Sequence, residues 1–188
     1  MARPPVARAR ALMLVAPLLA SGCHRSRHTH SDSFAPHPVP AGFVERSGAG
    51  WRLALPATWT DVTRKNSPAW VAADPHAADD YHANVNVVGE SFAGESYEYA
   101  RANLATLRQE PRAGVETQRE DVVDGDPTLL IETHWTPAPP SNVAYRTMQA
   151  AVSARGRGHV VTCAVAASAF ERYRSTCESI VRSFAVER

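Results

Sequence analysis

The alternation of apolar and polar residues predicts three strands in the first half of the chain. In the segment 51–56 apolar residues alternate with small or polar ones, and a proline ends the run. This is the pattern of a half-buried strand. The segment 68–74 predicts a second strand. The segment 84–88 alternates again, so that Val85 and Val87 face the interior.

The hydrophobic period then changes to that of a helix, between Ser96 and Glu110. Its apolar positions recur every three or four residues, at Tyr97, Ala100, Leu104 and Leu107. This spacing forms one stripe of an amphipathic helix. Ser96 is the expected N-cap, Glu98 complements the helix dipole in the first turn, and Pro111 ends the helix.

Four further runs predict two β-hairpins. They cover residues 115–123, 127–135, 143–153 and 159–166. Asp124-Gly125 joins the first pair, and the Arg-Gly-Arg-Gly segment 155–158 joins the second pair. Both connections contain glycine, which tolerates the positive φ that a tight hairpin needs.

The end of the chain predicts a second amphipathic helix. Ser168 and Glu171 have the spacing of a capping box. The inward stripe of this helix consists of Phe170, Tyr173, Cys177, Ile180, Val181 and Phe184. Antiparallel hairpins with one helix in the middle and one at the end predict an α+β domain over residues 43–188, with one meandering sheet covered by helices.

The first 22 residues have the pattern of a bacterial export signal. Residues 1–10 carry three arginines and no acid, and residues 11–20 are uncharged. Ten residues of helix cover only about 15 Å, which is too short to span a membrane. The segment 19–23, Leu-Ala-Ser-Gly-Cys, resembles the lipobox of bacterial lipoproteins, although leucine usually stands where this chain has Ala20. The resemblance implies a signal peptide over 1–22 and a lipid on Cys23; the alternative is a secreted protein with a free Cys23.

Residues 23–42 are expected to be the lipidated cysteine and a flexible tether. The segment is rich in His, Ser and Pro and has no apolar periodicity, so it cannot bury enough surface to fold. Its prolines favour an extended spacer that lifts the domain from the lipid surface. Its histidines are candidate metal ligands, but a flexible tract lacks the surrounding groups that orient ligands, so we expect no metal there.

The charge balance argues against a nucleic-acid binder. The chain has 20 Lys+Arg against 19 Asp+Glu, a formal net charge of +1, and no basic patch in the sequence. The motifs of nucleophile elbows, zinc proteases and phosphate loops do not occur in the sequence. We therefore expect a protein that is not an enzyme and uses no cofactor.

A few residues remain as candidates for binding. The segment 74–82 holds two histidines and three aspartates, which predicts a solvated acidic loop, with a divalent-cation site as the alternative. His134 and His159 lie in predicted strands and are expected to be hydrogen-bonded framework residues. Trp59 and Trp70 are expected in the core, with a groove as the alternative.

The three cysteines predict one disulfide. If Cys23 carries a lipid, Cys163 and Cys177 remain as an even pair. Cys163 lies in the last predicted strand and Cys177 on the inward stripe of the closing helix. A short connection joins these elements, so the two sulfurs are expected to meet in an oxidising compartment. The alternative is two buried free thiols.

The order of elements resembles the PsbP/DcrB-like (LpqN-like) domain. The resemblance rests on Leu-Pro-Ala-Thr-Trp at 55–59, the Asn-Val strand at 84–88, the helix at 97–109, the Asp-Gly hairpin and the final helix running into 183–186. It implies an αβα sandwich around a mostly antiparallel sheet, used as a non-catalytic binding or assembly module.

The expected function follows from the anchor and the resemblance together. The chain is expected to be an exported lipoprotein of the cell membrane or outer membrane, with its domain in the periplasm or on the extracytoplasmic side. Its expected partners are the membrane, through the lipid anchor, and an envelope protein. The alternative is a carrier or sensor for a small ligand, lipid or metal on the same anchor.

Overall fold

The computed structural model describes residues 39–137 and 142–188. The expected signal peptide, Cys23 and the tether up to residue 38 lie outside the described residues. No helix in the described part of the chain is long and apolar enough to cross a membrane.

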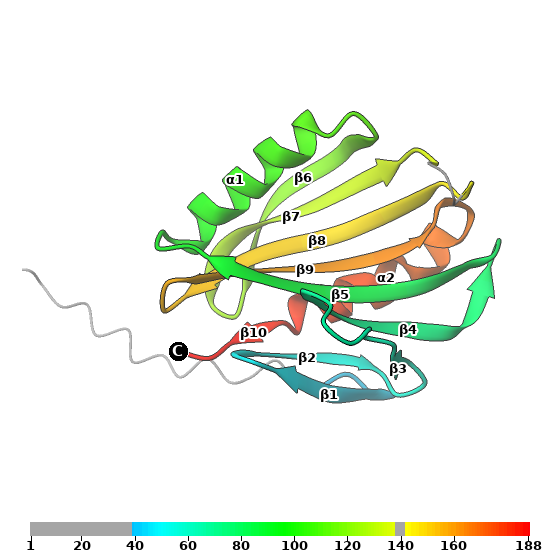
Figure 1. The fold of residues 1–188 in the computed structure, drawn as a ribbon, viewed down its shortest axis with the longest axis horizontal. Helices are drawn as coiled ribbons and strands as arrows, with labels where there is room; N and C mark the ends of the chain where they lie inside the picture. The colour runs from blue at the N-terminus through cyan, green and yellow to red at the C-terminus, as the bar shows by residue number, and fades with distance from the viewer. Residues whose placement is uncertain (1–38, 138–141) are drawn as a thin grey trace, which may run out of the picture. The chain divides into compact units, whose positions relative to one another are not determined.

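Ten strands and two α-helices make up the part of the chain that the structure describes (Figure 1). A 3-10 turn at Ala167–Ala169 precedes the second helix. The elements are β1 Phe43–Gly48, β2 Trp51–Pro56, β3 Thr60–Asp61, β4 Ala69–Ala78, β5 Tyr81–Ser91, α1 Ser96–Gln109, β6 Ala113–Val123, β7 Asp126–Trp135, β8 Tyr145–Ala154, β9 Arg157–Ala166, α2 Phe170–Arg182 and β10 Ala185–Val186.

Seven strands form the large sheet, in the order β3-β4-β5-β9-β8-β7-β6. Every neighbouring pair is antiparallel. The chain leaves the sheet after β5 through α1 and returns at the far edge as β6. It then meanders inward, so that β9 pairs with β5 and Val85 lies opposite Cys163.

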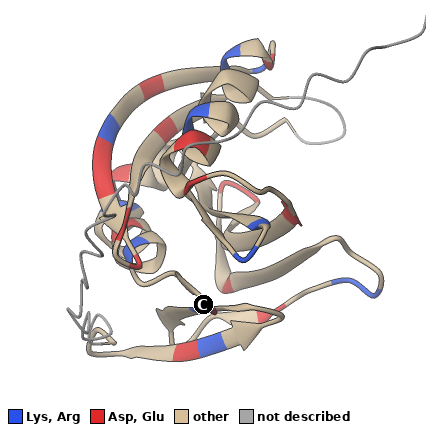
Figure 2. Ribbon diagram, turned by 90° about the vertical axis from the view of Figure 1, so that its left-hand side faces the viewer, with Lys and Arg blue, Asp and Glu red and all other residues tan. Residues whose placement is uncertain are grey.

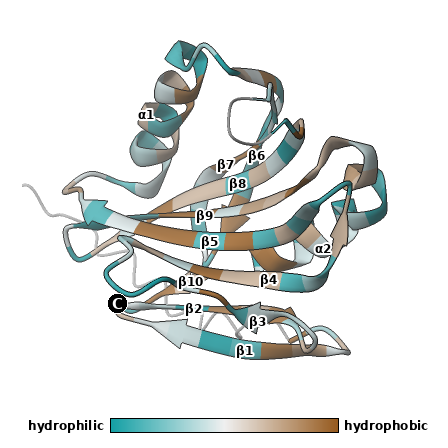
Figure 3. Cartoon of the chain, turned by 45° about the vertical axis from the view of Figure 1, so that its right-hand side comes forward, coloured by the Kyte–Doolittle hydropathy of each residue, from teal (hydrophilic) through white to brown (hydrophobic). Residues whose placement is uncertain are grey.

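The two helices cover opposite faces of this sheet. On one face α1 packs Tyr99, Leu104 and Leu107 against Leu129 and Ile131 of β7 and its neighbours. On the other face lies the larger cluster, to which α2 contributes Phe170, Cys177, Ile180 and Val181. Figure 3 shows β5 as hydrophobic in its middle and hydrophilic towards its ends. The expected α+β, αβα arrangement with a mostly antiparallel sheet is confirmed.

A second sheet departs from the expectation of one meandering sheet. It has the order β1-β2-β10, so that the segment 51–56 belongs to this small sheet and not to the large one. Ala185 of β10 lies opposite Arg52 of β2. The side-chain oxygen of Ser183 accepts a hydrogen bond from the Ala54 amide at 2.8 Å. This hydrogen bond joins residues 129 apart in the chain, a contact that local periodicity does not reveal.

The two glycine-containing hairpin turns have the positive φ angles expected from the sequence. Asp124 and Gly125 have φ of 55° and 80°, and Arg155 and Gly156 have φ of 50° and 76°. Positive φ at two successive residues gives the turn twist that matches antiparallel strands. Gly158 is not part of the turn: it lies in β9, where an added Cβ would come within 2.5 Å of the Tyr99 ring.

Both expected helix N-caps are wrong by one residue. Helix α1 is capped by Glu95, in a capping box with Glu98, and Ser96 is its first residue. The Ser96 hydroxyl is buried and donates a hydrogen bond to Asp126 at 2.8 Å. The side chain expected to cap the helix therefore makes a tertiary contact instead.

At α2 the N-cap is Ala169, without a side-chain cap. The expected capping box does not form, because both of its members have tertiary partners. Ser168 donates to Asp79 across the domain. Glu171 accepts from Arg146 at 3.0 Å instead of reaching back to the backbone.

Candidate functional site

A disulfide joins the large sheet to the second helix. The sulfurs of Cys163 in β9 and Cys177 in α2 are bonded, with the two Cα atoms 5.4 Å apart. Both residues are fully buried in the larger cluster. The bond is structural, because redox-active cysteines are partly exposed to solvent and this disulfide is buried.

A cleft of about 290 Å³ lies between the small sheet and the β4-β5-β9 part of the large sheet; we call it the tryptophan cleft. Its indoles are held in place. The Trp70 Nε1 donates to Asp61 at 2.8 Å. The ring of Trp51 lies 4.9 Å from that of Trp70. The lining residues are Gly48, Ala49, Trp51, Pro68, Trp70, Val87, Gly89, Arg157 and His159.

His159 is the buried polar residue of the tryptophan cleft. It is 4% exposed, and its Nδ1 has no hydrogen-bond partner within the described residues. Burial lowers the pKa of His159, and the charge of Arg157 lowers it further. His159 is therefore a neutral framework residue but not a hydrogen-bonded one, which corrects the expectation. His134, in contrast, is exposed, with Nδ1 3.6 Å from Glu116.

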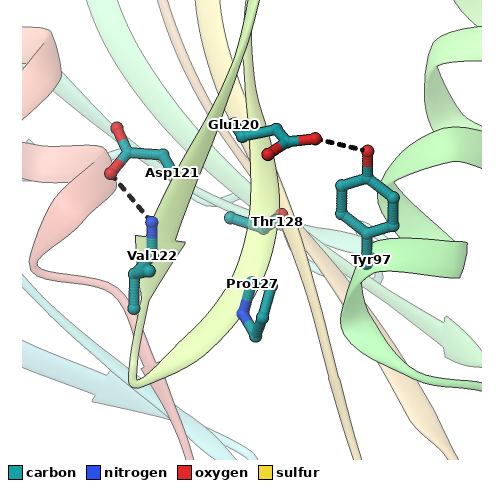
Figure 4. A pocket seen from close by; sticks show the side chains of 6 residues that line it. All are labelled: Tyr97, Glu120, Asp121, Val122, Pro127 and Thr128. Carbon is teal, nitrogen blue, oxygen red and sulfur yellow. Dashed lines mark hydrogen bonds between the residues drawn. The ribbon is translucent and has the colours of Figure 1, made fainter.

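A second hollow, of about 460 Å³, lies between the start of α1 and the β6-β7 hairpin (Figure 4); we call it the acidic hollow. The Tyr97 hydroxyl donates to Glu120 at 3.0 Å across it. This bond to a carboxylate raises the pKa of Tyr97. Val122, at 49% exposure, lies at its rim. The lining residues are Tyr97, Glu120, Asp121, Val122, Pro127 and Thr128.

The two carboxylates of the acidic hollow differ in their partners. Asp121 pairs with Arg182 at 2.9 Å and accepts from the Val122 amide at 2.8 Å. Glu120 has no ion-pair partner among the described residues. A carboxylate without an ion pair, beside an exposed valine, suits a partner that offers a cationic and an apolar group.

A buried ion pair lies where α2 meets the large sheet. The Glu132 side chain is 4% exposed and accepts from Arg174 at 2.5 Å and from Arg146 at 3.5 Å. Both guanidinium groups lie over the Phe170 ring, at 4.1 Å for Arg146 and 5.0 Å for Arg174. Glu171 binds the same two arginines from the solvent side. Hydrogen bonding to Arg174 lowers the pKa of Glu171 to about 2.

The segment 74–82 is a hairpin rather than a loop. Asp79 and Asp80 form its turn with φ of 51° and 59°. Asp74 is buried, and its carboxylate accepts from the Tyr173 hydroxyl at 2.8 Å and from the His76 amide at 2.9 Å. These bonds use Asp74 as a structural acceptor. Within residues 39–137 and 142–188, no group of three or more His, Cys, Asp or Glu side chains is arranged to hold a metal ion.

The two tryptophans named from the sequence have different environments. Trp59 is 2% exposed and belongs to the core, as expected. Trp70 is half-buried and lines the tryptophan cleft, which is the alternative that the sequence left open. No binding motif marks Arg157, Glu120 or Val122, so the sequence did not indicate them as candidate binding residues.

The α+β fold of this domain is similar to that of PsbP-like proteins. The solution structure of cyanobacterial PsbP (CyanoP) from Synechocystis sp. PCC 6803 is similar, with a TM-score of 0.53 and 16% identity over 78% of this chain and 94% of that chain. The Saccharomyces cerevisiae Ran-binding protein Mog1p has a TM-score of 0.51 and 12% identity, over 77% of this chain and 95% of that chain.

A third similar structure is a protein of unknown function, PA94 from Pseudomonas aeruginosa, described as a putative regulator. Its TM-score is 0.50 and its identity 12%, over 72% of this chain and 91% of that chain. No protein-family model and no curated protein matches the chain. At these identities the similarity establishes the fold.

Proposed function

We propose that this protein is a lipid-anchored binding module of the cell envelope. Cys23 carries the lipid, residues 24–42 provide reach, and the PsbP-like domain docks a protein partner on the extracytoplasmic side. The domain is a non-catalytic module in this proposal: it positions a partner and transforms no substrate.

The acidic hollow is the observation that carries the proposal. Glu120 presents a charge without a cationic partner among the described residues, and Val122 presents an apolar side chain beside it. Both residues lie in β6, which forms one edge of the large sheet. Figure 2 shows basic and acidic segments interleaved along the ribbon, and charges on an edge strand hinder indiscriminate strand pairing. A partner would therefore bind through side chains at the hollow.

The similar structures support a binding role. Mog1p is named for binding another protein, Ran. Its fold is similar to that of this chain, and we infer that this scaffold is suited to presenting a protein-binding surface. The partner of the present chain is defined by chemistry alone: an envelope protein with a cationic side chain next to an apolar one.

The anchor is tested by replacing its cysteine. We expect Cys23→Ala to move the protein from the membrane fraction to the soluble exported fraction, because acyl chains on Cys23 supply the membrane affinity. Metabolic labelling with palmitate, followed by fractionation, measures this. Cys177→Ala is the control that keeps Cys23 and should keep the label. A Cys23→Ala protein that remains labelled and membrane-bound would contradict the anchor.

The docking surface is tested by photo-crosslinking in intact cells. A photoreactive residue at position 122 should crosslink one envelope protein, whereas the same residue at position 62 should not. Val62 is a matched control because it is 50% exposed, against 49% for Val122. Glu120→Gln keeps the bond to Tyr97 but removes the charge, and it should reduce the crosslink. Equal crosslinks at 122 and 62, or none at either, would reject the acidic hollow.

A further inference from the structure

The tryptophan cleft contains two nitrogen donors that converge on one point. A Cβ placed on Gly89 would lie 3.3 Å from Nε2 of His159 and 3.4 Å from an Nη of Arg157. The glycine therefore leaves open the space that both side chains face. Gly89 lies opposite His159 in the β5-β9 pairing, so rigid strands hold this arrangement.

One ring nitrogen of His159 has no hydrogen-bond partner within the described part of the chain, and this decides which nitrogen carries the proton. Nδ1 is buried without a hydrogen-bond partner among the described residues. A proton on Nδ1 would be an orphaned buried donor, which folded proteins avoid more strictly than an unused acceptor. The neutral ring therefore carries its proton on Nε2, the nitrogen on the Gly89 side. This N–H is available to an acceptor in the cleft.

The charge of the cleft is positive. Arg157 makes no ion pair with a described carboxylate, and none of the nine lining residues is acidic. The carboxylate of Asp61 accepts a hydrogen bond from the indole of Trp70, one of the lining residues. A guanidinium beside a neutral N–H donor is a favourable environment for a carboxylate oxygen.

The remaining walls are apolar and rigid. Gly48 has no Cβ, and an added one would overlap the Trp51 ring at 2.4 Å, so the indole lies directly on the turn backbone. The Trp51 ring also lies 6.4 Å from the Phe184 ring on the core side. Pro68, Trp70 and Val87 complete an apolar lining. Aromatic rings pack well on such walls.

We propose that the tryptophan cleft is a binding site for a small aromatic carboxylate, whose ring lies against the indoles and whose carboxylate accepts from Arg157 and His159. A volume of about 290 Å³ corresponds to roughly ten water molecules, which is room enough for a single-ring acid. The site shares no residue with the acidic hollow, so it goes beyond the proposed docking function.

Benzoate is the probe, and benzamide is its neutral counterpart of the same shape. The full chain with Cys23→Ala is used, so that no detergent competes for aromatic acids. Titrations are followed by saturation-transfer NMR of the ring protons and by tryptophan fluorescence. We expect saturable binding of benzoate, at least about tenfold tighter than benzamide, because only the anion forms charge-assisted bonds.

Arg157→Gln should weaken benzoate binding by about tenfold and abolish the preference over benzamide. Arg155→Gln is the matched control: it removes the same charge from an exposed residue two positions away that does not line the cleft. Gly89→Ala should weaken benzoate binding without changing any charge, because its methyl group occupies the point between the two donors. Thermal melts establish that each variant is folded.

Three outcomes would overturn the site: no saturable benzoate binding, equal affinity for benzoate and benzamide, or equal weakening by Arg155→Gln and Arg157→Gln. The docking proposal is judged separately, by crosslinking at position 122. Loss of that crosslink with intact benzoate binding would reject docking alone, and the reverse result would reject the cleft alone.

Discussion

Removal of the Cys163–Cys177 disulfide should lower the free energy of unfolding by about 3 kcal/mol. The cysteines are 14 residues apart, and the chain-entropy model gives this value for a loop of about that length. The bond fixes α2 to β9, and α2 also packs against β8 and β2. Its loss therefore loosens the helix on both sheets and should reduce the melting temperature by about 10 °C.

Urea unfolding of the oxidised protein, with and without reductant, measures the effect directly. The Cys163→Ala/Cys177→Ala variant should show at least the same loss, because it also leaves space in the core. Reductant should not change the stability of that double variant. A wild-type protein that unfolds at the same urea concentration with and without reductant would show that the bond does not form in solution.

Glu132→Ala should destabilise the domain by about 3 kcal/mol, at the lower end of the range for breaking a buried ion pair. Glu132 lies on the same face of β7 as Leu130, and its carboxylate binds Arg174 and Arg146. Removing it leaves two guanidinium groups against Phe170 without their buried counter-charge. The cost is at the lower end because Arg174, 37% exposed, can turn to solvent.

Glu171→Ala is the matched control for this experiment. Glu171 binds the same two arginines, but its side chain is 69% exposed. Water and salt screen such pairs, so little change in stability is expected. Chemical unfolding of both variants at one pH makes the comparison. Equal destabilisation by the two substitutions would mean that burial does not determine how much the Glu132 ion pairs contribute to the free energy of unfolding.

The fold of the large sheet could be predicted because its signals are local. Strands β6 to β9 are long continuous runs of 10 or 11 residues, and their turns contain glycine at positions of positive φ. The small sheet could not be predicted. Only Phe43 and Val44 of β1 are even partly buried, and β10 has two residues, too few to show a period. Its existence depends on tertiary packing with α2.

The candidate sites were less predictable than the fold. Trp70 and His159 could be named from the sequence, but the approach of His159 and Arg157 to Gly89 depends on the register of β5 against β9. These two strands are separated in the chain by α1 and three other strands. Ser96 shows the same limit: its type suits a cap, and only the position of Asp126 decides that it bonds there instead.

The pairing of β2 with β10 constrains the order in which the domain can fold during synthesis. Because synthesis begins at the N-terminus, the β1-β2 hairpin can form early. The other edge of β2 stays unpaired until Ala185 and Val186 have been synthesised. The inner edge of β5 likewise waits for β9. Such late, long-range closures slow folding and leave strand edges uncovered in the interval. A chaperone that shields these edges until β9 and β10 have been synthesised would therefore help the domain to fold.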